Sequence, residues 1–207
     1  MTLILARLEK RKQTMRLPFN IICIDIETTD SAPEPGSVIQ IGAVVTNDEF
    51  EEVDSFETFI KPLDAYRNPK AMAVNRIPED TLKFAPTLQD ALEMFEAFAL
   101  REKTAKNEKV ILASWGDYFD VPFLKSQYDK IGRPWPFGYK SFDLKTIAIW
   151  ELGKRNIPLL GGVQKALQFL GLEFEGVQHD ALADVKNTIR ILKKLLQQER
   201  PKTGWDV

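Results

Sequence analysis

Short apolar runs in the first third of the chain predict three strands joined by tight connections. The run over residues 19–26 is rich in isoleucine, which is typical of a strand buried on both faces. A second apolar run covers 38–45, and an alternating pattern over 53–60 predicts a third strand. A loop over 30–36 and a turn over 47–49 connect them. Connections this short favour an antiparallel meander.

The rest of the chain has mainly helical periodicity, interrupted by two short strands. A long loop is expected over 63–86, with a helical turn near 77–82. Apolar residues then recur at helical spacing from Leu88 to Ala99, after Thr87, which resembles an N-cap. The remaining elements are expected in this order: strand 109–114, helix 120–131, strand 139–142, helix 144–152, a short helix between Gly161-Gly162 and Gly171, and helix 181–198.

This succession of elements predicts an α/β fold. Helical crossovers place strands in parallel, so the two later strands are expected to join the first three in one mixed sheet. The sheet would then hold three antiparallel strands plus two parallel ones, flanked by helices. Active sites in such sheets lie at strand ends.

Length and charge bound the class of protein. A chain of 207 residues forms one domain, or one domain with an appendage. The net charge of -2, from 28 basic and 30 acidic residues, argues against a broad electrostatic grip on duplex nucleic acid. This net charge is compatible with a protein that binds the end of a nucleic-acid strand at a local site.

Cysteine content and hydropathy bear on location. The single cysteine, Cys23, excludes an intrachain disulfide and favours a reducing compartment, so we expect a cytoplasmic protein. No apolar run approaches the roughly 20 residues that a membrane-spanning helix needs, so no membrane partner is expected.

The two ends of the chain are expected to lie outside the folded domain. Residues 1–18 form a basic N-terminal extension, interpreted as a short helix or tail, or as an arm that touches substrate or a partner. The domain is expected over 19–198, and 199–207 form a C-terminal tail.

Two carboxylates stand at the end of the first predicted strand. Asp25 and Glu27 are two residues apart, so their side chains point to the same side, roughly 6.5–7 Å apart along the strand. Two like charges that end a buried strand repel each other and lose hydration, and a bound cation is the usual compensation. A turn cap is the alternative for either residue.

Three later residues add candidate chemistry. Asp120 lies on the apolar stripe of the predicted helix 120–131, where a lone charge is costly, although it could cap that helix instead. Asp184 lies in the first turn of the last helix, which is also a favourable position relative to the helix dipole. His179 is the only histidine and precedes Asp184 by five residues; by itself it is equally explained as an ordinary surface or core residue.

Together these residues resemble the DEDDh family of 3′-to-5′ exonucleases, which includes proofreading polymerase subunits and ribonuclease T. The three motifs are similar to Asp25-Ile26-Glu27-Thr28-Thr29, to Phe119-Asp120-Val121-Pro122-Phe123-Leu124 and to His179-x-Ala181-x-x-Asp184. Val38–Ala43 resembles the second strand of the family. The resemblance covers about residues 19–197 and implies a ribonuclease H-like fold.

The resemblance implies roles for the candidate residues. Phosphodiester hydrolysis needs a nucleophile at neutral pH and relief of negative charge, and two divalent cations supply both. Carboxylate oxygens suit Mg²⁺, and Mn²⁺ is expected to work as well. The metal ligands would be Asp25, Glu27, Asp120 and Asp184, with Asp25 as the bridge. His179 would act as general base, because histidine titrates near neutrality. The residues expected to contact substrate are Thr28, Thr29, Arg76 and Phe119.

Three segments distinguish this chain within the family pattern. Trp115–Tyr118 and Phe56–Pro62 are similar to the branch that contains histone-mRNA and small-RNA exonucleases. Asp117 could in principle replace Asp120, but the spacing to Phe123 and Leu124 favours Asp120. Asn75-Arg76-Ile77 stands where many relatives have Thr-Gly-Ile beside the terminal nucleotide, so Arg76 is expected to meet phosphate.

Two other classes of protein are compatible with parts of this pattern. One is a non-catalytic nucleic-acid-binding module on the same fold, and the other is a structural interaction domain with accidental motifs. A binding module has no need of four carboxylates and a histidine, so the sequence favours an exonuclease. The expected substrate is the 3′ end of single-stranded RNA or DNA, with nucleoside 5′-monophosphates as products.

Overall fold

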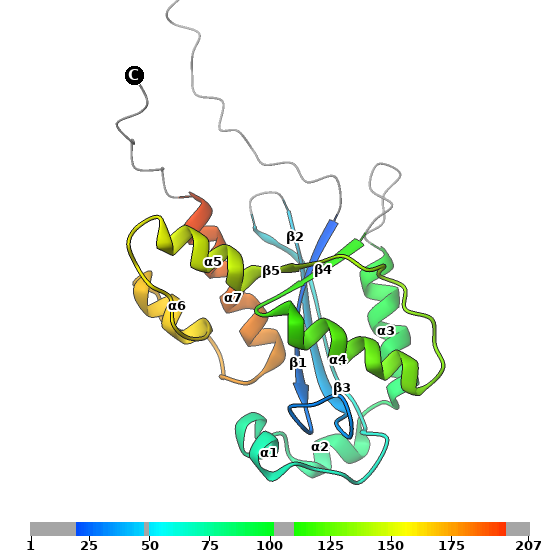
Figure 1. Cartoon of the computed structure of the whole chain (residues 1–207). Coiled ribbons are helices and arrows are strands. Elements are labelled where there is room, and N and C mark those ends of the chain that lie inside the picture. Colours follow the sequence, from blue (N-terminus) through cyan, green and yellow to red (C-terminus); the bar gives the residue numbers. More distant parts are fainter. Residues whose placement is uncertain (1–19, 48–49, 102–109, 198–207) are drawn as a thin grey trace, which may run out of the picture.

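The computed structural model describes residues 20–47, 50–101 and 110–197, which form one sheet layer between helices (Figure 1). The five strands lie in the order β3-β2-β1-β4-β5. β2 is antiparallel to β1 and to β3, whereas β4 runs parallel to β1 and β5 parallel to β4. The predicted mixed sheet is therefore confirmed. The strand bounds are β1 Asn20–Thr28, β2 Val38–Thr46, β3 Glu52–Phe59, β4 Val110–Ser114 and β5 Ser141–Asp143.

Helices cover both faces and one end of the sheet. Figure 1 shows α3 and α4 on one side, α5, α6 and α7 on the other, and α1 and α2 beyond the end of β1. The helices of the described residues are α1 Pro69–Asn75, α2 Glu79–Phe84, α3 Leu88–Arg101, α4 Asp117–Lys130, α5 Leu144–Gly153, α6 Val163–Phe169 and α7 Ala181–Gln197.

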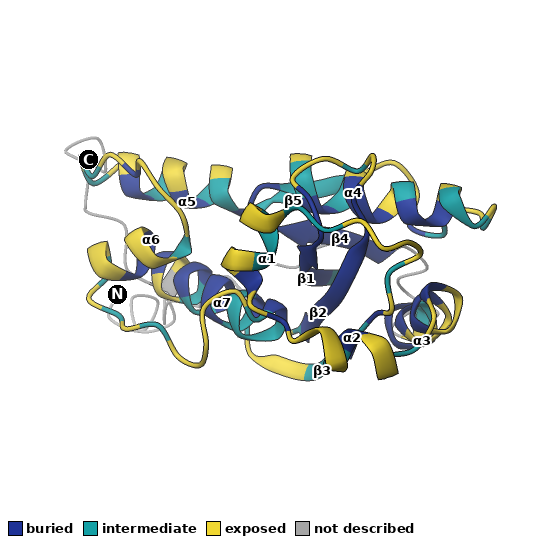
Figure 2. Ribbon diagram, turned by 90° about the horizontal axis from the view of Figure 1, so that it is seen from below, coloured by how far each residue is buried: buried dark blue, intermediate teal, exposed yellow. Residues whose placement is uncertain are grey.

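The side chains of β1 alternate between two hydrophobic cores. Ile22, Ile24 and Ile26 belong to the core that α3 and α4 cover. Cys23 belongs to the core that includes Val185 of α7. Figure 2 shows the buried residues concentrated on the sheet and on the helix faces turned toward it. Because side chains alternate along a strand, the carboxylates that follow Cys23 at even spacing face α7.

The predicted loop over 63–86 contains a helix that the periodicity did not indicate. In α1, Asn68 is the N-cap and its side chain accepts a hydrogen bond from the N–H of Lys70, while Pro69 occupies the first helical position. The predicted helical turn near 77–82 lies within and just before α2. With only seven residues, α1 offers two turns of pattern, which is too little for a periodic signal.

Two boundaries differ from those expected. The helix predicted from Asp120 begins at Asp117, and its N-cap is Gly116, whose φ of 100° is a backbone conformation that glycine adopts readily. The last strand is Ser141–Asp143 rather than 139–142, and Asp143 caps α5 by accepting from the N–H groups of Lys145 and Thr146.

The predicted extension over 1–18 and the tail over 199–207 lie outside the described residues. Within the described part of the chain, no helix is long and apolar enough to cross a membrane. The cytoplasmic location stays a prediction.

Candidate active site

The first two carboxylates stand on the central strand, close to its end. Asp25 and Glu27 both face α7, and Glu27 is buried while Asp25 is partly exposed. β1 pairs with β2 along this whole stretch, with Asp25 opposite Gly42 and Glu27 opposite Gln40. Two paired strands therefore fix the backbone positions of both carboxylates.

Asp120 reaches the site from the first turn of α4. Its side chain is 4% exposed, although it is a carboxylate on a helix. The turns that follow bury Phe123 and Leu124, so the stripe that anchors α4 to the core also orients Asp120 inward. Since Gly116 is the N-cap, the capping alternative for Asp120 does not apply.

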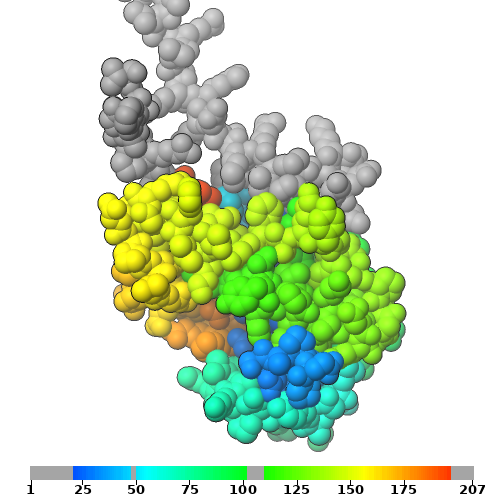
Figure 3. Space-filling view, in the orientation of Figure 1, coloured from blue at the N-terminus to red at the C-terminus, as the bar shows by residue number. Residues whose placement is uncertain are grey.

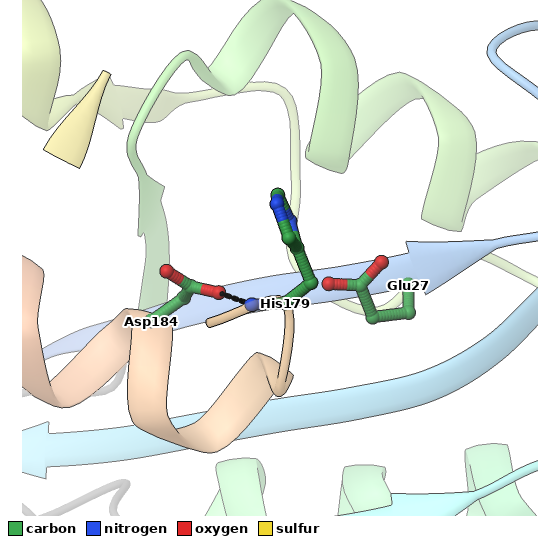
Figure 4. A group of neighbouring side chains, drawn as sticks. All are labelled: Glu27, His179 and Asp184. Carbon is green, nitrogen blue, oxygen red and sulfur yellow. Dashed lines mark hydrogen bonds between the residues drawn. The ribbon is translucent and has the colours of Figure 1, made fainter. Parts of the chain in front are cut away.

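Asp184 and His179 come from the start of α7 and the loop before it. The backbone N–H of His179 donates to Asp184 Oδ2 at 2.9 Å (Figure 4). His179 has a φ of 63°, which is uncommon for a residue other than glycine. Figure 4 shows Asp184 and Glu27 on either side of His179. One potential ligand atom from each of these three residues lies within 4.8 Å of the other two.

All five candidate catalytic residues line one cavity of about 830 Å³. They come from four separate parts of the chain: β1, α4, the loop before α7, and α7 itself. In Figure 3 the surface is hollowed between the green α4, the orange start of α7 and the teal α1. A volume of this size is typical of a small-ligand site.

Burial raises the pKa of all four carboxyl groups. The pKa of Glu27 rises to about 8 and that of Asp120 to about 7, in both cases chiefly through burial. The pKa of Asp25 lies well above its usual range, because of burial and then of repulsion from Asp120, Asp184 and Glu27. Burial raises the pKa of Asp184 too, although the hydrogen bond from the N–H of His179 lowers it.

This electrostatic pattern fits a cation site. Buried carboxylates that repel one another hold protons at neutral pH unless a positive charge lies between them. The donor set consists of carboxylate oxygens with one imidazole nearby, which suits Mg²⁺ and Mn²⁺. The residues present therefore fit the divalent cations that the resemblance implies.

The four residues expected to contact substrate do not share one location. Thr28 and Phe119 line the cavity, as does Asn75. Thr29 is fully buried, and its hydroxyl accepts a hydrogen bond from the N–H of Ser37 at 2.9 Å, so its side chain does not reach the cavity. Arg76 is exposed at the end of α1 with a φ of 58°, and it is not among the residues that line the cavity. The substrate contacts expected of Thr29 and Arg76 stay predictions.

Asp30 also lines the cavity, although its sequence context indicates only a loop. It is 7% exposed, and its carboxylate accepts from Tyr66 Oη and Asn68 Nδ2, each at 2.8 Å, and from the N–H of Ala32 at 3.0 Å. The hydrogen bond from Asn68, followed by that from Tyr66, lowers the pKa of Asp30 to about 2. Asp30 thus ties the segment before α1 to the end of β1. The sequence signal that could have indicated this contact is Asn68-Pro69, because an N-cap residue followed by proline marks the start of a helix.

The fold and this cluster of carboxylates together define a nuclease-type hydrolase. Residues 22–192 match the model of the RNase_T family, described as Exonuclease. The chain belongs to this exonuclease family.

Two relatives and one solved structure agree with this assignment. The chain is 26% identical over 200 residues to ribonuclease T of Wigglesworthia glossinidia brevipalpis, covering 91% of this chain and 90% of that one. It is 30% identical over 175 residues to the PolC-type DNA polymerase III of Clostridium perfringens, covering 83% of this chain but only 11% of the polymerase. The nuclease domain of 3'hExo, a DEDDh family member solved with rAMP bound, has a TM-score of 0.71 at 22% identity, covering 86% of this chain and 92% of that chain. The resemblance to the DEDDh exonucleases and the ribonuclease H-like fold are thereby confirmed.

Proposed function

We propose that the chain is a 3′-to-5′ exonuclease that hydrolyses phosphodiester bonds at the 3′ end of single-stranded RNA or DNA. Its products would be nucleoside 5′-monophosphates. The observation that carries the proposal is the convergence of four carboxylates and the only histidine on one cavity. The exonuclease family and the neighbouring structure with bound rAMP support it.

Asp25, Glu27, Asp120 and Asp184 are proposed to hold two divalent cations, Mg²⁺ or alternatively Mn²⁺. When bound, these cations lower the pKa of water and relieve charge on the phosphate and the leaving oxygen. Asp25 is proposed as the shared ligand, since repulsion from the other three carboxylates contributes to its raised pKa. The carboxylates would bind in the ionised form, so cation binding is expected to release protons.

His179 is proposed as the general base. It lies at the exposed mouth of the cavity, next to Asp184 and Glu27, where an imidazole nitrogen can accept a proton from the attacking water. The hydrogen bond from its own N–H to Asp184 fixes the backbone from which the ring projects. Asp184 would then contribute both a metal contact and the orientation of the base.

Thr28 and Phe119 are proposed to contact the terminal nucleotide. Phe119 is partly buried, and its ring packs against that of Phe123, with 5.4 Å between the two ring centroids. Stacking of a base on an aromatic ring is independent of sequence, which suits an enzyme that shortens many different strands. We propose in addition that the catalytic domain comprises residues 19–198 and acts in the cytoplasm.

A digestion of labelled oligonucleotides tests this function. Single strands of RNA and of DNA with a 5′ label would be incubated with Mg²⁺, with Mn²⁺ or with EDTA. A ladder that shortens from the 3′ end only when cations are present is the expected result. Binding without cleavage would support the alternative of a non-catalytic nucleic-acid-binding module. Cleavage of circular single strands would contradict the exonuclease, and activity in EDTA would contradict the role of the carboxylates.

A further inference from the structure

Gln40 of β2 is a buried amide that joins the sheet to the start of α7. Its side chain is 1% exposed. Nε2 donates to Glu57 Oε1 at 2.8 Å and to Asp180 Oδ2 at 3.0 Å, while Oε1 accepts from the N–H of Ala181 at 3.2 Å. Both hydrogens of Nε2 are therefore used by carboxylates, and this fixes which side of the amide faces Ala181. Nothing in the chemistry proposed above uses Gln40.

Asp180 transmits this restraint to the candidate general base. It directly follows His179, and its Oδ1 accepts from the N–H of Ala183 at 2.9 Å, so it caps α7. The N–H of His179 is held separately by Asp184. The left-handed backbone at His179 is thus fixed from both sides, as a strained residue at a functional site must be.

Gly42 of β2 allows the start of α7 to lie directly against the sheet, because it has no side chain. A Cβ on Gly42 would lie 2.3 Å from the N atom of Leu182 and 2.4 Å from the carbonyl carbon of Ala181. Gly42 and Gln40 are two residues apart and lie on the same side of β2. The first residue lets the helix start approach the strand closely, and the second binds it there.

We propose that Gln40 is a positioning residue that holds the His179 ring beside Glu27 and Asp184, with Glu57 orienting the amide. The proposal rests on the proposed function of His179 and Asp184, and it adds to that site a residue of the neighbouring strand β2, on the same face of the sheet as Glu27. Gln40 is not among the residues that line the cavity. Its loss would let the loop before α7 move while the four carboxylates stay on their elements.

The test compares Gln40→Met with Gln127→Met. Gln127 is also a buried glutamine, 0% exposed, and its Oε1 accepts from the N–H of Val38, in the other hydrophobic core and outside the cavity lining. Both variants lose buried hydrogen bonds, so both should melt at lower temperature. Only Gln40→Met should lose kcat, by about 10–100-fold, the range for residues that orient a catalytic group, with KM changed by less than about threefold.

An activity-independent readout comes from the imidazole itself. Because His179 is the only histidine, its ring gives a single set of proton–carbon NMR signals that need no assignment by mutation. We expect Gln40→Met to shift or broaden these signals and their response to Mg²⁺, and Gln127→Met to leave them as in the wild type. If Gln40→Met does not fold, Glu57→Ala is used instead, because Glu57 is exposed. This variant should change kcat and the imidazole signals in the same direction, but by less.

Unchanged imidazole signals or unchanged kcat in the Gln40 variant, or in its Glu57 substitute, would overturn the proposal. An equal loss of kcat in Gln127→Met would overturn it too, because the effect would then reflect general destabilisation. A wild type without nuclease activity would contradict the proposed function, whereas the imidazole signals would still test whether Gln40 positions His179.

Discussion

Asp117 and Asp120 lie in the same turn of α4, but only Asp120 enters the cavity. Asp117 accepts a hydrogen bond from the hydroxyl of Ser141 on β5, whereas Asp120 is buried beside the carboxylates of β1. The two residues are three positions apart, and the helix directs one to the neighbouring strand and the other to the site. This geometry separates two carboxylates that the sequence alone left as alternatives.

The first prediction follows from this separation. Asp120→Asn should reduce kcat by more than about 100-fold, because loss of a ligand should exceed the cost of altering a residue that only orients one. Asp117→Asn should leave kcat near the wild-type value, since an asparagine oxygen still accepts from Ser141. Steady-state digestion of a short oligonucleotide measures both. Thermal melting checks that both variants fold, and a reversed order of effects would contradict the assignment of Asp120.

The second prediction concerns His179. Its removal should cost roughly 10²–10⁴-fold in kcat, the typical contribution of a general base. His179→Asn is the preferred variant, because asparagine tolerates the left-handed backbone that His179 adopts and so removes the ring without adding strain. Turnover measures the loss, and calorimetric titration with Mn²⁺ should show cation binding retained. Loss of binding would instead make the imidazole a metal ligand.

The sequence predicted the sheet, and it singled out the carboxylates that converge on the cavity, because these signals are local. The isoleucine-rich run of β1 and the Asp25-x-Glu27 pair stand together in the chain, and alternation along a strand gives their common direction. Asp120 could be placed on a buried stripe because its helix repeats over several turns. The start of that helix was misplaced, since it depends on the backbone of Gly116 rather than on a side-chain cap.

The parts that the sequence did not predict depend on contacts between distant segments. Gln40 and Asp180 are 140 residues apart, and Asp30 and Asn68 are 38 apart. No periodicity links such pairs, and each residue type is common in loops and strands. Thr28 and Thr29 show the same limit: the β1–β2 register shifts between Glu27 and Thr28 and β1 ends there, so simple alternation does not give the direction of either side chain. Thr28 lines the cavity, whereas the hydroxyl of Thr29 accepts from the N–H of Ser37.

The third prediction addresses the wall of the cavity that α1 forms. Asp30 holds the segment before α1 through Tyr66 and Asn68, and Lys70 and Asn75 of this wall line the cavity. Asp30→Ala should therefore raise KM for short oligonucleotides about tenfold, the equivalent of one charge-assisted hydrogen bond, with less effect on kcat.

Tyr66→Phe is the matched control for this wall. It removes one hydrogen bond and leaves Asn68 and the backbone N–H of Ala32 on Asp30, so its effect on KM should be smaller. The Michaelis constants of both variants test this order of effects, and their melting temperatures check that both fold. A lower melting temperature with an unchanged KM in Asp30→Ala would restrict Asp30 to the stability of the fold.

The fourth prediction links pH, cations and stability. Glu27 is ionised in the unfolded chain above its ordinary pKa of 4.5, but in the cation-free folded protein it keeps its proton up to about pH 8. Between these values the folded state binds more protons than the unfolded state, so the free energy of unfolding falls as pH rises. Burial shifts Asp120 in the same direction, to about 7. The proton on Glu27 therefore contributes fully to the free energy of unfolding below pH 4.5, and this contribution is lost as the pH rises from 4.5 to about 8.

Thermal melting in EDTA across this pH range should show the midpoint falling as pH rises. Mg²⁺ or Mn²⁺ should raise the midpoint, and by more at pH 8 than at pH 6, because cations bind the deprotonated carboxylates and stabilise only the folded state. The double variant Asp25→Asn/Glu27→Gln is the control, since it keeps the shape of the site but removes two of the titrating groups. It should flatten the pH dependence in EDTA and abolish most of the cation effect. A wild-type midpoint that rises with pH in EDTA, or one that cations leave unchanged at pH 8, would contradict a cation site built from these carboxylates.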